Sequence, residues 1–300
     1  MGKLGSRYLD EIKDLIDAES EDMKREIATI ISSIIEFHVD TLEVDSKKKE
    51  ELEDYIVNAC LNCKYVRGAN INKVESYKYK EGAFEASLKI ENGNLIGVDK
   101  KITMPSTYQI ENAYYQKMMI KEILKMIRNE NGFRLTRTRL QKRNGLEKTN
   151  YKYDEHGEIV TTSHMGYGLE NGSIEYITNK ILSSITNNMP DVKENYDRLI
   201  AGELMDADGI NLGRELLNAS ITGDATMLTT TINACGIDYD ELVKITDKYS
   251  DLEASKLRAV DDDELYKKID DTMNKYLEEK IVPMICTIKK NKMRESGKVI

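Results

Sequence analysis

Along this chain of 300 residues the period at which apolar residues recur changes from helical to strand-like and back, and this feature constrains the fold most. In residues 6–39 and 46–63 apolar side chains recur every three or four positions, which is typical of amphipathic helices. In residues 74–104 and 132–164 polar and apolar residues alternate, which is typical of strands. The helical period returns from residue 173. We therefore expect an α+β fold that is mostly helical.

Turn signals divide the two strand-rich blocks. ENGN at residues 91–94 predicts a hairpin turn in the first block, and Asn144-Gly145 and Glu155-His156-Gly157 interrupt the second. Between the blocks we expect a helix over residues 109–129. Its buried face is predicted by an i, i+3, i+4, i+7 set of Ile120, Ile123, Leu124 and Ile127.

These patterns suggest three regions. Residues 1–68 form a helical N-terminal region, and residues 69–260 form a central domain that contains both strand-rich blocks. Residues 261–300 form a C-terminal helix, over 261–279, and a basic tail that follows Pro283.

Composition narrows the choice of partners and compartment. A net charge of −9 argues against a general nucleic-acid binder, so no nucleic acid is expected as a partner. The basic stretch RLTRTRLQKR, residues 134–143, favours a solvated strand or loop, with contact to RNA or phosphate as the alternative. No tract is long enough to span a bilayer and the N-terminus lacks a signal pattern, so we expect a cytoplasmic protein without a membrane partner.

The four cysteines are expected to be reduced in that compartment. Cys60 and Cys63 form a C-x-x-C pair, but no second pair completes a zinc ribbon. Buried structural cysteines are the favoured interpretation.

Three blocks in order carry a family resemblance. They are YYQKMMIKEILKMIR at residues 114–128, GYGLENGSIEYIT at 166–178 and LGRELLNASITGDATMLTTTINACGIDYDELVKI at 212–245. Together they resemble bacterial zincin-type metallopeptidase homologues of the gluzincin kind. In that family an H-E-x-x-H helix is followed by a β-hairpin and then by a helix that reads G-L-N-E-G-x-T-E-Y-L-T. The resemblance implies a zincin-like core, in which a small β-sheet packs on an active-site-type helix between helical N-terminal and C-terminal parts.

The motif is degenerate at its metal ligands. In H-E-x-x-H the two histidines bind zinc, the glutamate is the general base, and a glutamate on the next helix is the third ligand. The resemblance places Lys121 and Lys125 at the histidine positions, Glu122 at the general-base position and Asn171 at the third-ligand position. A lysine ammonium has no lone pair for a metal. The sequence therefore predicts no metal site and no cofactor.

Further residues on the second helix are cleft candidates by the same resemblance, namely Glu170, Glu175 and Tyr176. Two interpretations of the first helix stay open. In one, a lysine ammonium occupies the zinc position and neutralises Glu122 by charge-assisted hydrogen bonds. In the other, KEILK is an exposed helix edge with ordinary Glu–Lys pairs.

The chain has three histidines, of which His156 and His164 lie in or beside the predicted second hairpin. A rearranged metal site that joins His164 to Glu122 and Glu170 is conceivable. The favoured interpretation is that both histidines are surface loop residues.

The resemblance and its substitutions imply a catalytically inactive metallopeptidase-like protein that binds a peptide or protein partner. One alternative is a metal-dependent hydrolase or peptidase with relocated ligands, for which Glu122 would still be essential. A further alternative is a structural or assembly protein that oligomerises through its terminal helices. The sequence does not fix the oligomeric state.

Overall fold

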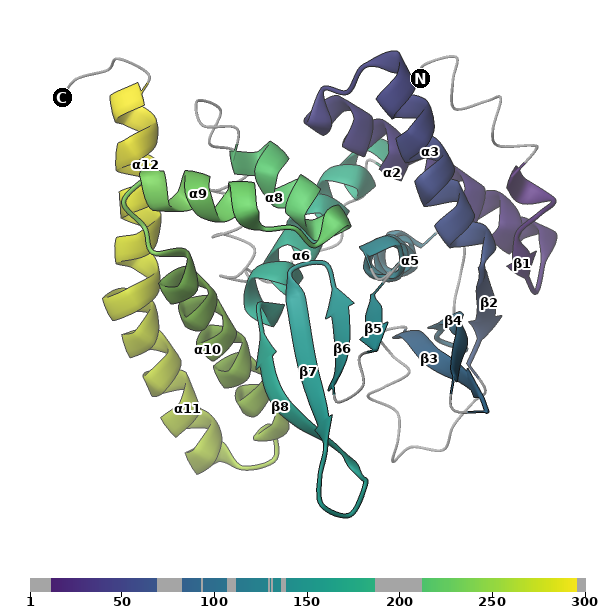
Figure 1. Cartoon of the computed structure of the whole chain (residues 1–300). Helices are drawn as coiled ribbons and strands as arrows, with labels where there is room; N and C mark the ends of the chain where they lie inside the picture. Colours follow the sequence, from purple (N-terminus) through teal and green to yellow (C-terminus); the bar gives the residue numbers. More distant parts are fainter. Residues whose placement is uncertain are drawn as a thin grey trace. The chain divides into compact units, whose positions relative to one another are not determined.

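A computed structural model describes most of the chain (Figure 1). The described residues are 12–68, 83–92, 94–106, 112–128, 130, 132–135, 139–186 and 212–295. Within them the fold is α+β, with helices predominant and two four-stranded sheets. The contacts divide the chain into two compact units, which we call unit 1 (Met1–Glu130 and Ile177–Val192) and unit 2 (Asn131–Tyr176 and Lys193–Ile300). The regions predicted with boundaries at 68/69 and 260/261 follow a different division and stay predictions.

Three helices build the core of unit 1: α2 (Glu21–Leu42), α3 (Ser46–Leu61) and α5 (Ala113–Arg128). Each of them contacts the other two. The two helices predicted over 46–63 and 109–129 are confirmed within the described residues. The predicted buried face of α5 is also confirmed, because Ile120, Ile123, Leu124 and Ile127 are fully buried.

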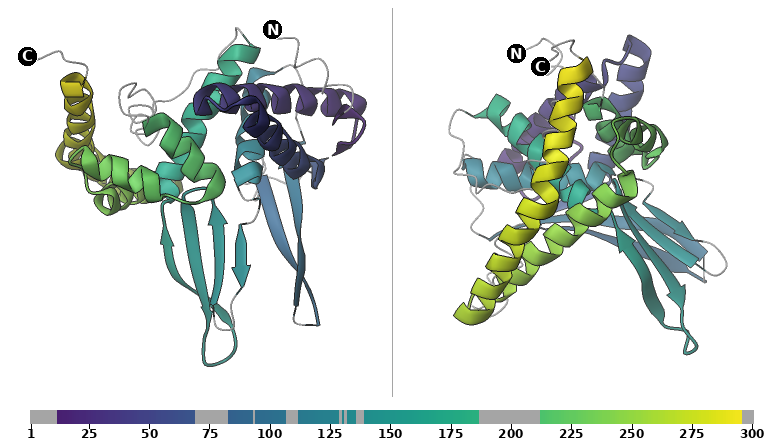
Figure 2. Two further views of the ribbon diagram at one scale, coloured as in Figure 1. Left: turned by 45° about the horizontal axis from the view of Figure 1, so that its top comes forward. Right: turned by 90° about the vertical axis from the view of Figure 1, so that its left-hand side faces the viewer.

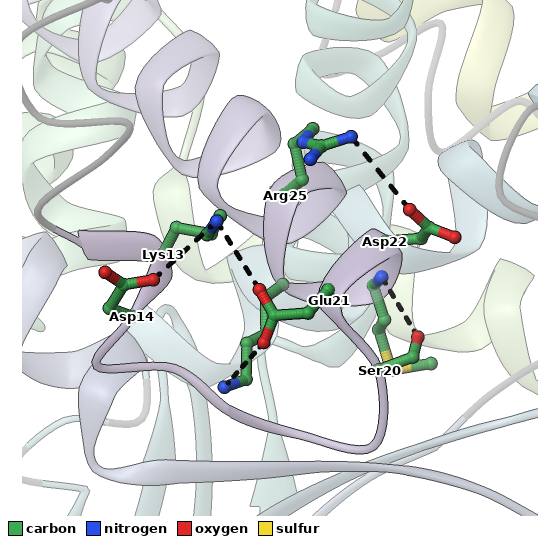
Figure 3. A network of polar contacts seen from close by, with 8 residues as sticks. Lys13, Asp14, Ser20, Glu21, Asp22 and Arg25 are labelled. Carbon is green, nitrogen blue, oxygen red and sulfur yellow. Dashed lines mark hydrogen bonds and ion pairs between the residues drawn. The ribbon is translucent and has the colours of Figure 1, made fainter.

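The prediction of one helix over residues 6–39 is wrong at residues 14–20, and residues 6–11 lie outside the described residues. The chain leaves the helical conformation there, forms β1 (Asp17–Ala18), and starts α2 at Glu21. The local reason is a cap, because Ser20 Oγ accepts a hydrogen bond from Met23 N at 3.2 Å. Lys13 crosses the break to pair with Glu21 at 3.4 Å (Figure 3).

The sheet of unit 1 has the order β1-β2-β4-β3. Its longer strands are β2 (Cys63–Arg67), β3 (Ala83–Glu91) and β4 (Asn94–Met104). β1 and β4 each pair with β2 in parallel, whereas β3 and β4 form the antiparallel hairpin that ENGN predicted. The turn residue Asn92 has a φ of 52°, which asparagine tolerates better than most residues. Residues 69–82, at the start of the first predicted strand block, lie outside the described residues.

The sheet of unit 2 is an antiparallel meander in chain order. Its strands are β5 (Phe133–Leu135), β6 (Arg139–Asn144), β7 (Glu147–Tyr153) and β8 (Ile159–Met165). The predicted turns are confirmed at Gly145 and Gly157, which have φ values of 65° and 79°. Glycine suits these left-handed positions because it has no Cβ.

The helical part after the second sheet starts earlier than predicted. α6 (Tyr167–Ile185) begins six residues before residue 173, directly after β8. The other helices of unit 2 are α8 (Leu212–Thr222), α9 (Thr226–Ala234), α10 (Tyr239–Arg258), α11 (Asp263–Tyr276) and α12 (Val282–Glu295). They share one apolar core with Leu146 and Leu169.

The basic tail predicted after Pro283 is helical up to Glu295 in the structure. A π-helical turn, η1 (Leu277–Ile281), joins α11 to α12, so that the two helices form one long rod beside α10 (Figure 2). Pro283 has no N–H to donate within this continuous rod, and the π-helical turn directly before it is the kind of irregularity at which a helix accommodates a proline. In the described part of the chain no helix has both the length and the apolar character needed to cross a membrane.

Candidate functional site

Glu122 lies on the buried face of α5 and is 1% exposed. Its Oε2 accepts a hydrogen bond from the backbone N–H of Phe84 on β3 at 2.7 Å. Its Oε1 accepts one from Lys125 Nζ, also at 2.7 Å. Both oxygens of the Glu122 carboxylate are therefore bound within unit 1.

The contact between Lys125 and Glu122, at i,i+3 spacing, fits both interpretations of KEILK, so the burial of Glu122 is the observation that bears on them. Glu122 is buried, so an exposed helix edge is wrong for this residue. Lys125 is half-buried and forms the charge-assisted bond that the first interpretation requires. Lys121, one residue before Glu122, is also half-buried and has electrostatic or hydrogen-bonding contacts of its own.

Glu170 is the second buried carboxylate among the predicted residues. It lies in the first turn of α6 and accepts a hydrogen bond from Leu146 N at 2.9 Å. It also lies directly beneath Gly145, where a Cβ would come within 2.3 Å of Glu170 Oε1. Glu170 therefore supports the turn between β6 and β7 in unit 2.

The remaining cleft candidates follow Glu170 along α6. Asn171, at the third-ligand position, is exposed, whereas Glu175 and Tyr176 are half-buried. A step of one residue along a helix turns the side chain by about 100°, which explains why Glu170 points inward while Asn171 faces solvent.

The structure brings Glu122 and Lys125 together, and it places them in unit 1. Residues 170, 171, 175 and 176 belong to unit 2. The convergence of the two groups in one cleft stays a prediction.

The histidines have other partners. His164 lies on β8, where its Nε2 is 2.8 Å from Glu147 Oε1 and its ring stacks on Tyr167. His156 is exposed in the turn between β7 and β8. Among the described residues no group of three or more His, Cys, Asp or Glu side chains is arranged to hold a metal ion.

Sequence reasoning missed Asp247, a buried residue of α10. Its carboxylate accepts hydrogen bonds from the backbone N–H groups of Gly166 and Gly168, both at 2.8 Å. Burial raises the pKa of Asp247, although these two bonds favour its charged form. The bonds satisfy free donors at the start of α6 and explain its early beginning. The Gly-Tyr-Gly spacing was the one local sign of this tight junction.

Cys60 and Cys63 are buried, as predicted, whereas Cys235 is half-buried and Cys286 is exposed. Burial raises the pKa of the Cys60 and Cys63 thiols, to about 12 for Cys63, so neither is a reactive thiolate at neutral pH. A cavity of about 510 Å³ in unit 1 lies beside Cys63 and Lys100. Lys100 is itself buried and bonded to Glu130, and burial lowers its pKa.

Comparison of the chain with protein-family models, with curated proteins and with solved structures finds no match.

Proposed function

We propose that the chain is a non-catalytic protein with a zincin-like core that binds a peptide or protein partner. The observation that carries this proposal is the position of Glu122. A general base must reach the proton that it removes, directly or through one water. The carboxylate of Glu122 is instead buried, with one oxygen on a backbone N–H and the other on an ammonium.

The substitutions at the ligand positions support the same conclusion. Lys125 donates its ammonium to the carboxylate, which is incompatible with simultaneous binding of a zinc ion by its nitrogen. Asn171 offers an amide oxygen, which is a weak zinc ligand compared with a carboxylate.

The strand that Glu122 contacts is the part of unit 1 best suited to an extended peptide. β3 is an edge strand of the described sheet, with β4 as its neighbour. The N–H of Phe84 points to Glu122 and hence away from β4. Because backbone groups alternate in direction along a strand, the N–H groups of Ala86 and Leu88 point to the same side. An edge of this kind binds peptides by adding a strand to the sheet.

Catalysis is tested by metal content and peptide cleavage together. The full chain, purified without chelators, is assayed for zinc and for cleavage of a mixed fluorogenic peptide library, beside Glu122→Gln. We expect much less than one zinc per chain, and the same background cleavage for both proteins. One tightly held zinc per chain whose removal abolishes cleavage would overturn the proposal and favour the hydrolase with relocated ligands.

Peptide binding is tested at the β3 edge. Peptides selected from a random displayed library are titrated calorimetrically against the full chain and against Ala86→Pro, which removes the outward N–H. Ala86→Ser keeps that N–H and is the matched control. We expect Ala86→Pro to weaken binding about tenfold or more, since one main-chain hydrogen bond and its neighbours are lost. Equal affinity for both variants would place the binding surface elsewhere.

A further inference from the structure

One face of the unit 2 sheet carries five of the six Lys and Arg side chains of its described strands, and the sixth, Lys142, lies on the opposite face. In the strand register Arg134 is paired with Gln141, Arg139 with Lys152, and Arg143 with Lys148. Directly paired residues point to the same face, and side chains alternate along each strand. All five cations therefore lie on one face, which we call the basic face.

A row of hydrogen-bonded side chains supports the assignment of these residues to one face. Gln141 Nε2 donates to Asn150 Oδ1 at 2.9 Å, and Asn150 Nδ2 donates to Ser163 Oγ at 2.8 Å. The row crosses β6, β7 and β8 between the two cation pairs. Each pair is two residues along the strand from the row, or about 7 Å away.

The basic face contains no acidic residue among the described strand residues. Glu147 is the one acid in the four strands, and it lies on the opposite face with His164. The aromatic residues Phe133, Tyr151 and Tyr153 also lie on that opposite face.

Exposure is greatest at the end of the basic face that lies near the β7–β8 turn. Arg139 and Lys152 are exposed there, and Arg134, opposite Gln141 at the level of the polar row, is exposed as well. At the other end Arg143 donates to Thr222 O at the end of α8. The pKa of Asp224, just beyond, is lowered first by hydrogen bonds from Thr226 and further by the charge of Lys148.

Two pairs of cations lie directly opposite each other on this face. They are Arg139 with Lys152 and Arg143 with Lys148, one on each side of the polar row. Like charges placed in this way repel, although Arg143 also bonds to Thr222 O and Asp224 lies near Lys148. A polyanion laid along this face would be attracted by both pairs.

We propose that the basic face binds the phosphate backbone of a nucleic acid. Arginine and lysine supply the phosphate contacts, and the amides of the central row are the groups that bond to sugars and base edges. The absence of aromatic residues from the face, within the described strands, predicts binding without base stacking, so that duplex and single strand both bind. The net charge of −9 does not oppose this, because Glu147, the one acid of the described strands, lies on the opposite face of the sheet.

The test is fluorescence anisotropy with a labelled single-stranded RNA of about 20 nucleotides and with its duplex. Binding is measured between about 50 and about 200 mM salt, where phosphate contacts weaken steeply. The double variant Arg134→Glu, Lys152→Glu removes two exposed cations. The matched control is Lys267→Glu, Lys268→Glu on α11, which changes the net charge equally at exposed positions.

We expect both nucleic acids to bind, with affinity that falls as salt rises. The double variant on the basic face should bind about tenfold more weakly and with a shallower salt dependence, and the α11 control should change less than about twofold. Lys152→Glu alone should also keep or raise the melting temperature, because it places an acid opposite Arg139.

Three results would overturn the proposal. The first is no binding of either nucleic acid at the lowest salt. The second is an equal loss of affinity in the α11 control. The third is binding to vesicles of anionic phospholipid without binding to nucleic acid, which would assign the basic face to a membrane surface.

Discussion

At the scale of single residues, three of the buried carboxylates in the described part of the chain accept hydrogen bonds from backbone N–H groups. Glu122 accepts from Phe84, Glu170 from Leu146, and Asp247 from Gly166 and Gly168. A buried acceptor that loses its partner costs the free energy of its desolvation, so these carboxylates tie elements together. Their shared role is structural.

Glu170→Ala should lower the free energy of unfolding by about 1 to 3 kcal/mol, because it leaves Leu146 N buried without its acceptor. The adjacent Asn171→Ala is the control, since this side chain is exposed and its loss should change stability by less than about 0.5 kcal/mol. Urea unfolding of both variants measures the difference. Equal effects would show that the Glu170 contact contributes nothing.

His38 should make stability depend on pH. It is fully buried in α2, and burial lowers its pKa to about 4, with Arg128 adding to the decrease. Between about pH 6.5 and pH 4 the unfolded chain binds a proton that the folded chain does not. The free energy of unfolding should therefore fall by up to about 3 kcal/mol as the pH drops through this window.

His38→Gln cannot titrate and should lack this part of the pH dependence. Chemical denaturation at about pH 7 and about pH 4.5 provides the comparison. If the variant loses as much stability as the original chain over this interval, the effect comes from other groups.

The sequence predicted the buried face of the helix that carries Glu122, but it left open whether Glu122 itself is buried, and it did not predict the backbone contact with Phe84. The i, i+3, i+4, i+7 pattern of that face is local, and α5 follows it. The bond to Phe84 N joins residues 38 positions apart, and Asp247 lies 81 and 79 positions from its two donors. Contacts of this range depend on the tertiary fold, which local periodicity does not encode.

At the scale of elements, the junction of α6 with α10 depends on a glycine. A Cβ on Gly168 would lie 2.3 Å from the backbone of Thr246. Gly168→Ala should therefore destabilise the protein by about 3 kcal/mol or more, because backbone atoms on both sides must move.

Gly157 provides a control in which the backbone conformation, and not close packing, favours glycine. Its φ is 79°, but a Cβ there would meet nothing within 4 Å. Gly157→Ala should cost only about 1 to 2 kcal/mol of conformational strain. Thermal or urea unfolding of the pair separates close packing from backbone conformation, and a smaller effect at Gly168 than at Gly157 would contradict this account.

The elements that the sequence predicted correctly are those with strong local signals. The ENGN hairpin and the turns at Gly145 and Gly157 follow from residues that adopt left-handed backbone conformations. The predictions fail where a capping side chain, a long-range hydrogen bond or a helix irregularity overrides the local periodicity. Ser20 interrupts the N-terminal helical pattern, Asp247 starts α6 early, and the π-turn η1 carries the final helix past Pro283.

At the scale of the whole chain, charge is distributed unevenly. The overall charge is −9, whereas one face of the unit 2 sheet carries only cations among its charged strand residues. Linear sequence shows the basic stretch at residues 134–143, but only strand register shows that Lys148 and Lys152 join it. Net charge alone therefore does not describe how charge is distributed over this sheet.

Each of the two units also combines segments that are far apart in the sequence. The first half of α6, up to Tyr176, belongs to unit 2, and the part from Ile177 belongs to unit 1. Each unit has its own buried core, with α2, α3 and α5 in one and α8 to α12 in the other. Periodicity identifies helices, but it does not assign them to cores.

The central claim is that Glu122, which the sequence resemblance places at a general-base position, stabilises the fold. Replacing a catalytic residue commonly leaves stability unchanged or increases it, because active sites trade stability for function. Urea unfolding of Glu122→Ala tests the claim most directly. We expect the free energy of unfolding to fall by about 2 kcal/mol, as Phe84 N and Lys125 lose their shared acceptor. Unchanged or increased stability in Glu122→Ala would contradict the account.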